Sequence, residues 1–261
     1  MPALLSGRVA LITGGGGEIG AAIARRFAAE GAAVAVADIR LDKADAVARE
    51  IADGGNRSLA LPANVAVPDE AERSVNLAVE TFGALTTLVN VAAAVTPDGT
   101  VETLTLAQWN EALAINLTGA FLMCKYAVPE MRKAGGGTIV NIASQLGQIG
   151  VPGRAPYSTS KAALIQFTKC LAADYAKDGI RANSLSPGGV DTARTLRRFG
   201  TREAANRARG PYHLLGRTGR VDEIAAGALF LACEESSFMT GADLLLDGGY
   251  LAFKGVLSAP T

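Results

Sequence analysis

The chain has 261 residues, of which 49% are hydrophobic and 19% charged, which suits a large α/β domain and excludes an intrinsically disordered chain. Lysine plus arginine and aspartate plus glutamate number 25 each, so no global field favours nucleic acid or an anionic membrane surface. No uninterrupted apolar run approaches a membrane span, and no signal-peptide pattern occupies residues 1–8, so a cytoplasmic protein is expected.

Short apolar runs alternate with longer amphipathic runs along the chain. In chain order, the first half predicts strand 8–13, helix 18–30, strand 33–38, helix 42–53, strand 58–61, helix 68–82, strand 85–90 and helix 105–132. The second half predicts strand 138–142, helix 156–177, strand 181–185, an irregular segment 191–215, helix 221–233 and strand 243–246. Strands joined by helices are parallel, so the pattern predicts one doubly wound sheet of about seven strands, with helices on both faces and residues 1–261 as a single domain.

Histidine and cysteine usage restricts the chemistry. His213 is the only histidine, which excludes a histidine-rich zinc site, and no metal is expected. A hydrolase using Ser144 and His213 is disfavoured because Ser144 lacks a G-x-S-x-G elbow. Cys124, Cys170 and Cys233 are widely spaced in apolar helical contexts and are expected to be reduced core residues.

A glycine-rich stretch, 13–20 (TGGGGEIG), joins the first predicted strand to the first predicted helix. At such a junction, backbone N–H groups approach a pyrophosphate and the helix N-terminus favours its charge. The G-x-G-x-x-G spacing alone is weak evidence for a dinucleotide site, and a turn without a ligand is the alternative. The position of the motif between the first strand and the first helix strengthens this evidence. The residues expected at the pyrophosphate are Gly14, Gly17, Glu18, Ile19 and Gly20.

Asp38 ends the second predicted strand, 18 residues after Gly20. A carboxylate here accepts hydrogen bonds from the adenosine ribose hydroxyls and repels a 2′-phosphate, which favours NAD over NADP. Two alternatives are open: Asp38 caps a helix or is solvated, or Arg40 pairs with a 2′-phosphate.

Tyr157 and Lys161 are one helical turn apart, so their side chains share a face. A nearby ammonium favours tyrosinate, which can take a proton from an alcohol or return it to a carbonyl. Ser144 follows the fifth predicted strand at the carboxyl edge, where open α/β sheets bind ligands, and its hydroxyl can polarise a substrate oxygen. Two exposed helix residues are the alternative interpretation of Tyr157 and Lys161.

These motifs occur in the order typical of the short-chain dehydrogenase/reductase family, which the chain resembles over nearly its full length. Ser144 precedes Tyr157 by thirteen residues, as is usual in that family. The other matching segments are Thr13-Gly14 through Gly20, Asn116-Leu117-Thr118-Gly119, Tyr157-Ser158-Thr159-Ser160-Lys161, Pro187-Gly188-Gly189-Val190-Asp191-Thr192 and Asp247-Gly248-Gly249.

The resemblance implies a role for each catalytic position. Tyr157 is the general acid/base, Lys161 favours its ionised form and holds the nicotinamide ribose, and Ser144 orients the substrate oxygen. Asn116 supports a water and proton relay to Lys161, although taken alone it indicates a local helix kink. Besides Asp38, Tyr157, Lys161 and the glycine-rich turn, the positions expected to contact NAD are Asn64, Val65, Asn90, Pro187, Val190 and Thr192.

Three positions depart from the family pattern. Glu18 replaces a glycine, and its carboxylate near the expected pyrophosphate is expected to weaken cofactor binding. Two alternatives are open: Gly17 supplies the close approach instead, or Glu18 points to solvent. Asn64 replaces an aspartate. Residues 91–93 replace most of an Asn-Asn-Ala-Gly segment, of which Asn90 and one alanine remain.

The resemblance places a substrate lid at about 191–215, and residues 193–212 carry six arginines against only Glu203. Because arginine pairs well with carboxylates and phosphates, an anionic substrate is one hypothesis, and a solvated or subunit-facing helix is the alternative. Arg154 and His213 flank the expected pocket, as substrate contacts or as surface and packing residues. The arginines of the segment are Arg194, Arg197, Arg198, Arg202, Arg207 and Arg209.

The leading interpretation is therefore an NAD-dependent oxidoreductase acting on a secondary alcohol or its ketone. A β-ketoacyl-thioester reductase, with an acyl-carrier-protein or CoA substrate and NADPH, is the alternative within the family. A catalytically silent nucleotide-binding module is the alternative of another class. The resemblance also implies a homotetramer, with helices 105–132 and 156–177 in one interface and residues 250–261 near another.

Overall fold

The computed structural model describes residues 3–94, 96–253 and 255, except for the side chains of Arg194, Arg197 and Arg198. Within these residues seven strands form one parallel sheet in the order β3-β2-β1-β4-β5-β6-β7. The chain winds outward from β1 to β3 and then returns to place β4 on the other side of β1. This order confirms the predicted doubly wound α/β fold.

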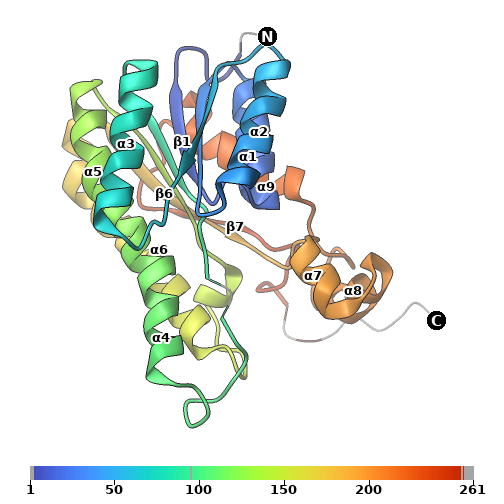
Figure 1. Cartoon of the computed structure of the whole chain (residues 1–261). Coiled ribbons are helices and arrows are strands. Elements are labelled where there is room, and N and C mark those ends of the chain that lie inside the picture. Colours follow the sequence, from blue (N-terminus) through green and yellow to red (C-terminus); the bar gives the residue numbers. More distant parts are fainter. Residues whose placement is uncertain (1–2, 95, 254, 256–261) are drawn as a thin grey trace.

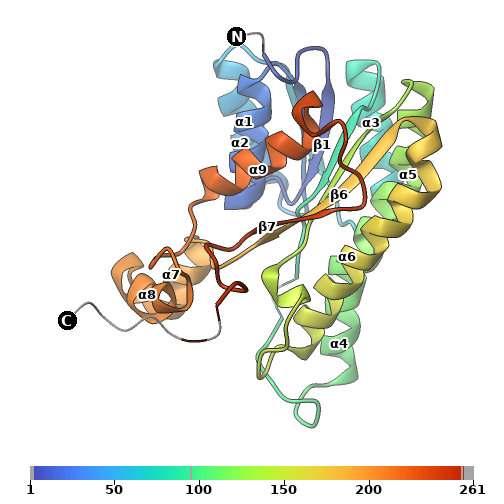
Figure 2. The same cartoon turned by 180° about the vertical axis from the view of Figure 1, so that it is seen from behind.

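Figures 1 and 2 show helices on both faces of the sheet. The strands are β1 (Val9–Thr13), β2 (Ala33–Asp38), β3 (Ser58–Pro62), β4 (Thr87–Asn90), β5 (Gly137–Ile142), β6 (Ile180–Pro187) and β7 (Asp243–Leu246). The larger helices are α1 (Glu18–Ala29), α2 (Leu41–Asp53), α3 (Pro68–Phe82), α4 (Leu106–Leu113), α5 (Gly119–Lys133), α6 (Ala155–Tyr175), α7 (Ala193–Phe199), α8 (Arg202–Arg209) and α9 (Val221–Ala232).

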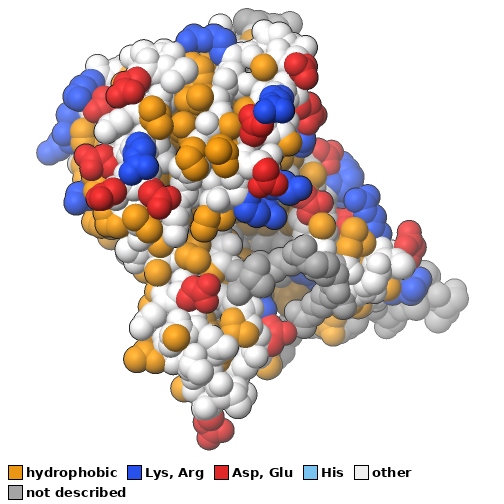
Figure 3. Space-filling model, in the orientation of Figure 1, with side chains coloured by type: hydrophobic (Ala, Val, Ile, Leu, Met, Phe, Trp, Pro, Cys, Tyr) orange, Lys and Arg blue, Asp and Glu red, His pale blue; other side chains and the backbone are white. Residues whose placement is uncertain are grey.

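Two apolar layers hold these helices on the sheet. Side chains alternate between the faces of a strand, so Ala10 and Ile12 of β1 join the core under α1, α2 and α9. Val9 and Leu11 join the core under α3, α5 and the end of α6. Both faces of the central strands are thus buried, which explains why β1 reads as a continuous apolar run. Acidic and basic side chains are interspersed on the surface that Figure 3 shows.

The predicted helix 105–132 is observed with an interruption. Thr105 and Gln108 form the predicted capping box at its start. A π-helical turn, η1 (Ala114–Thr118), separates α4 from α5. Among the described residues, Leu106–Lys133 is also the one helical run long and apolar enough to span a bilayer, at 28 residues, although half of its most apolar window is buried. Core helices of globular proteins share these properties, and polar and charged residues interrupt this run, so it is not the uninterrupted apolar stretch whose absence was noted in the sequence.

Two predictions were wrong. Residues 191–215 are not irregular, because they contain α7, α8 and a short 3-10 turn, Gly210–Tyr212. Thr201 caps α8 by accepting a hydrogen bond from the backbone N–H of Ala204. Cys124 and Cys233 are buried as expected, but Cys170 lies on the solvent face of α6, where apolar neighbours in sequence do not imply burial.

Candidate active site

A cleft of about 620 Å³ opens at the carboxyl ends of β5 and β6. In Figure 1, α4 and the adjoining part of α6 extend below the sheet on one side, and α7 and α8 lie on the other. Parallel strands end together at this edge, so side chains far apart in sequence meet there. The expected catalytic and cofactor residues that line the cleft are Ile19, Ser144, Tyr157, Lys161, Pro187, Val190 and Thr192.

Helix α6 brings Tyr157 and Lys161 to this cleft. The Lys161 side chain is buried, and its Nζ donates a 2.7 Å hydrogen bond to the carbonyl oxygen of Ile142, at the end of β5. The same Nζ lies 5.9 Å from the centroid of the Tyr157 ring. Ser144 begins the loop after β5, and its Oγ accepts a hydrogen bond from the backbone N–H of Leu146. The predicted trio thus shares one cavity, with the ammonium close to the phenol.

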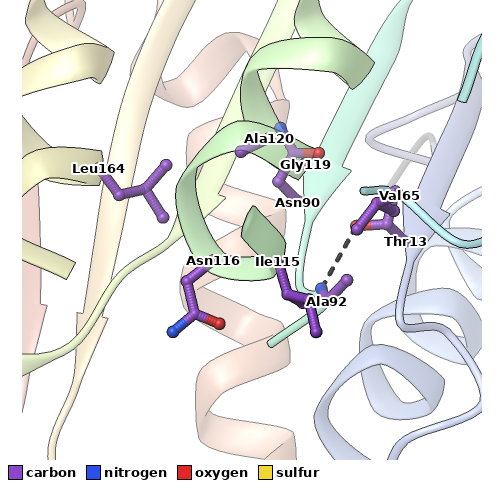
Figure 4. A pocket seen from close by; sticks show the side chains of 9 residues that line it. All are labelled: Thr13, Val65, Asn90, Ala92, Ile115, Asn116, Gly119, Ala120 and Leu164. Atoms are coloured by element: carbon purple, nitrogen blue, oxygen red, sulfur yellow. Dashed lines mark hydrogen bonds between the residues drawn. The ribbon is translucent and has the colours of Figure 1, made fainter. Parts of the chain in front are cut away.

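Asn116 lies in the π-helical turn, where its amide joins two parts of the site. Its Oδ1 accepts a hydrogen bond from the backbone N–H of Ala94, at 2.7 Å, and its Nδ2 donates to Ser160 Oγ, at 2.9 Å. Ser160 Oγ in turn donates to the carbonyl oxygen of Tyr157. Figure 4 shows the small pocket beside this turn, with Thr13 hydrogen-bonded to Ala92. Ser160, which the motif contains but sequence reasoning did not single out, therefore connects Asn116 to α6.

The glycine-rich turn has the shape that its sequence predicts. Gly14 has φ +63°, a conformation that favours glycine. A Cβ on Gly20 would lie 2.3 Å from the carbonyl oxygen of Gly14, so only glycine allows α1 to pack this closely on the turn. Gly17 is the N-cap of α1, and among the described residues no side chain caps its first turn. The N-terminal N–H groups of α1 therefore suit an anion.

Asp38 lies at the end of β2 beside this turn. Its Oδ2 accepts a hydrogen bond from the backbone N–H of Gly16, and its Oδ1 accepts one from the backbone N–H of Arg40, both at 3.0 Å. The Arg40 Nε is 3.9 Å from the same carboxylate. The Asp38 carboxylate is thus fixed next to the glycine-rich turn, and the Arg40 guanidinium lies toward this carboxylate.

Glu18 is exposed, as one of the expectations has it, but its carboxylate also contacts another part of the protein. Its Oε2 accepts a 2.5 Å hydrogen bond from the backbone N–H of Ala193, the first residue of α7. A carboxylate at the start of a helix is favourable because it faces unpaired N–H groups. The residue that replaces a family glycine therefore joins the glycine-rich turn to the α7–α8 segment, residues 193–209.

Three other expected cofactor positions are largely occupied with local structure. Asn64 Oδ1 accepts a hydrogen bond from the backbone N–H of Ala66, and Val65 is buried against Gly119. Asn90 lies on the face of the sheet under α5, where its Nδ2 donates to Asn141 Oδ1 at 2.8 Å and lies 3.6 Å from Cys124 Sγ. Asn64 and Asn90 therefore already hydrogen-bond within the protein, although Asn90 Oδ1 has no partner among the described residues.

The substrate candidates have different outcomes. Arg154 lines the cleft, but its Nη1 pairs with Asp98 Oδ1 at 2.5 Å, so the guanidinium already has a carboxylate. His213 also lines the cleft and is only 2% exposed. Its Nε2 accepts a hydrogen bond from the backbone N–H of Gly189, and its Nδ1 is 2.9 Å from the carbonyl oxygen of Arg209. The side chains of three further candidates, Arg194, Arg197 and Arg198, lie outside the described residues.

Asp98 and Gln145 are among the cleft residues that were not identified from the sequence as parts of a site. Asp98 follows β4 in a loop without a motif, and Gln145 directly follows Ser144. Arg209 was noted only as one of several arginines in the segment, and the structure places it on the cleft wall, with Nη1 3.4 Å from Thr195 Oγ1. The adjacency of Gln145 to Ser144 was the one available signal.

Comparison with known proteins agrees with this geometry. A family model described as enoyl-(acyl carrier protein) reductase matches residues 16–251. The 2,5-dichloro-2,5-cyclohexadiene-1,4-diol dehydrogenase LinX of Sphingobium indicum is 39% identical over 94% of this chain and 97% of that protein. The cis-4-hydroxycyclohexanecarboxylate dehydrogenase of Sinomonas cyclohexanicum is also 39% identical, over the same shares of each chain. A solved structure of 7α-hydroxysteroid dehydrogenase, complexed with NADH and 7-oxo glycochenodeoxycholic acid, superposes with a TM-score of 0.89 at 31% identity and covers 95% of this chain and 96% of that one.

Proposed function

The chain belongs to the short-chain dehydrogenase/reductase family, and we propose that it is an NAD-dependent dehydrogenase that interconverts a secondary alcohol and its ketone. The observation that carries the proposal is the placement of Lys161 Nζ 5.9 Å from the Tyr157 ring, in one cleft with Ser144. Relatives named as dehydrogenases of ring alcohols support the same reaction.

The residues present fit a nicotinamide dinucleotide. The uncapped start of α1 and the glycine cradle of Gly14 and Gly20 would hold its pyrophosphate. Asp38 would accept hydrogen bonds from the adenosine ribose, and Pro187, Val190 and Thr192 line the part of the cleft beside Tyr157 where the nicotinamide would lie. When bound, NAD would accept the hydride that leaves the alcohol carbon.

The chain itself supplies the proton chemistry. Tyrosinate at Tyr157 takes the hydroxyl proton during oxidation and returns it during ketone reduction. The carbonyl oxygen of Ile142 holds the Lys161 ammonium, which keeps its positive charge near the phenol of Tyr157. Ser144 lies in the same cleft and hydrogen-bonds the substrate oxygen, which fixes the carbinol carbon for hydride transfer.

A substrate panel monitored at the absorbance of NADH tests the reaction. Wild type should reduce NAD with cyclic secondary alcohols such as cyclohexanol, and Tyr157→Phe should lose at least about a hundredfold in kcat, since acid/base groups contribute roughly 10²–10⁴. Binding of NADH by Tyr157→Phe serves as the folding control. Retained turnover in Tyr157→Phe would refute the mechanism, and wild-type binding of NADH without turnover on the panel would favour a silent module.

Cofactor preference is a separate proposal that depends on Asp38. The wild-type protein should bind NADH more tightly than NADPH, because the carboxylate beside Gly16 repels a 2′-phosphate. Asp38→Ala should remove the repulsion, leave Arg40 to meet the phosphate, and narrow or reverse the preference. Fluorescence titration with both dinucleotides measures it, and tighter NADPH binding by wild type would instead support the β-ketoacyl-thioester reductase.

The substrate is proposed to be a cyclic alcohol, neutral or carrying a carboxylate. Apolar side chains line much of the cleft, among them Val91, Leu146, Val151 and Phe199. Arg209 also lines the cleft, and its guanidinium would pair with a carboxylate on the substrate. Cyclohexanol and cis-4-hydroxycyclohexanecarboxylate form the matched pair for an assay. Arg209→Gln should raise KM for the carboxylate selectively, and an equal change for both substrates would dismiss anion capture. We further propose that residues 191–215 act as the substrate lid, within a single domain of a cytoplasmic enzyme.

A further inference from the structure

Arg154 contacts the ring of Tyr157 from the start of the same helix. It is the N-cap of α6, three residues before Tyr157. Its guanidinium carbon lies 5.2 Å from the centroid of the Tyr157 ring, within the range of a cation–π contact. This is closer than the 5.9 Å that separates Lys161 Nζ from the same centroid. The phenol therefore has two cations beside its ring, and only Lys161 has an assigned role.

Asp98 holds this guanidinium in place. The ion pair joins Arg154 Nη1 to Asp98 Oδ1 at 2.5 Å, with side chains that are 17% and 51% exposed. The backbone adds a second connection, because Gly99 pairs with Arg154 as an isolated parallel bridge and the Gly99 N–H donates to the carbonyl oxygen of Gly153. The loop after β4 is thus joined to the start of α6 directly beside the acid/base residue.

A planar guanidinium that is ion-paired and packed on an aromatic ring restricts how that ring turns. Because Asp98 balances its charge, Arg154 adds packing to the phenol with little net field. We propose that Arg154 is a positioning residue that fixes the ring of Tyr157 for proton transfer, and that Asp98 balances its charge so that Lys161 supplies the main positive field at the phenol. This proposal rests on the assignment of Tyr157 as the acid/base.

The charged and titratable groups around this ring come from four elements. Helix α6 supplies Arg154 and Lys161, and the loop after β4 supplies Asp98. The segment after β6 contributes Arg209, Tyr212 and His213 to the same cleft, and Tyr250 lines it from the chain's C-terminal part. Arg154 and Lys161 lie over the Tyr157 ring itself, at 5.2 Å and 5.9 Å from its centroid.

The first experiment separates positioning from binding. Arg154→Ala should lower kcat for alcohol oxidation about fivefold, the loss expected for one cation–π contact, while the Kd for NADH stays unchanged. Arg154→Lys keeps the charge without the planar fork and should recover part of the loss. Lys169→Ala, an exposed cation further along α6, is the matched control. An Arg154→Ala effect no larger than that of Lys169→Ala would overturn the proposal.

The second experiment uses the pH profile, which a purely structural role would not move. In alcohol oxidation, kcat/KM rises with pH as tyrosinate forms. Asp98→Asn leaves the guanidinium unbalanced, which favours tyrosinate and should move this rise to lower pH at low ionic strength. Arg154→Ala leaves the Asp98 carboxylate unbalanced and should move the rise to higher pH. Shifts in the same direction, or none in either variant, would contradict the proposal.

Failure of this inference can be distinguished from failure of the enzyme assignment. If wild type shows NAD-linked turnover that Tyr157→Phe abolishes, the assignment holds whatever the Arg154 variants do. Circular dichroism and NADH binding show whether each variant folds. Should Arg154→Ala not fold, the other two variants still decide. An unchanged kcat in Arg154→Lys, together with an unmoved pH profile of kcat/KM in Asp98→Asn, would refute the role of Arg154.

Discussion

His213 is buried between the α7–α8 segment and the loop after β6, and its two ring nitrogens are both in use. The backbone N–H of Gly189 donates to Nε2, so Nε2 carries no proton and Nδ1–H donates to the carbonyl oxygen of Arg209. Burial lowers the pKa of His213 below its ordinary value of 6.5, although the Arg209 carbonyl opposes this. The neutral form is therefore the one that the fold accommodates.

This burial predicts a loss of stability at acid pH. Below about pH 6.5 the unfolded chain binds a proton that the folded His213 resists, so the free energy of unfolding falls as the pH falls below that value. His213→Gln, which has an acceptor for the Gly189 N–H but does not titrate, should flatten this dependence between pH 6.5 and about 5. Thermal denaturation across this range measures it, and parallel curves for the two proteins would show that His213 does not contribute.

Gly20 gives a second prediction at the scale of single residues. An alanine Cβ there would lie 2.3 Å from the carbonyl oxygen of Gly14, which is backbone and cannot turn aside. Gly20→Ala should therefore shift the turn, cost about 1–3 kcal/mol in the free energy of unfolding, and weaken NADH binding. Gly83→Ala, at a position with open space but positive φ, is a control for general glycine loss. Equal NADH binding in the two variants would contradict the close-packing argument.

Contacts within one helix can be predicted from the sequence, whereas contacts between elements far apart in the chain cannot. The shared face of Tyr157 and Lys161 could be predicted because a helical period is local, and both side chains do line one cleft. The Glu18 contact could not be predicted, because its partner Ala193 is 175 residues away and the contact depends on how α7 lies. Asp98 and Arg154, 56 residues apart, meet for the same kind of reason. A local helix kink was expected at Asn116, but its π-helical form was not, since one extra residue in a turn leaves the apolar pattern nearly unchanged.

The Glu18 contact predicts how the α7–α8 segment is held. Glu18→Ala removes the acceptor for the Ala193 N–H, so the segment should open more often and its arginines should be cleaved faster by trypsin, by about fivefold for one charge-assisted hydrogen bond. Glu18→Gln retains an acceptor oxygen and should give an intermediate rate. Cleavage is followed by mass spectrometry of the released peptides. Equal rates in wild type and Glu18→Ala would mean that the contact does not hold the segment.

The whole molecule presents apolar side chains that its own core does not cover. Phe121 of α5 is 46% exposed, although its ring packs 6.2 Å from that of Phe167 on α6. Both aromatic residues lie on the two helices that the family resemblance places in a subunit interface. An exposed phenylalanine packed on a partly buried one, on a face shared by two long helices, is the kind of surface that a symmetric contact between copies buries.

A homotetramer is therefore expected in solution, and the α5–α6 face is expected to form one of its interfaces. Phe121→Glu should leave the fold intact, because the side chain is already half in solvent, but it should place a carboxylate in the interface and release smaller species. Ala46→Glu, an exposed position on α2 across the sheet, is the matched control and should sediment as wild type does. Analytical ultracentrifugation distinguishes the outcomes. A wild-type monomer would dismiss the assembly, whereas a Phe121→Glu tetramer would place its interfaces on other faces, since a buried unpaired charge at this position could not be tolerated.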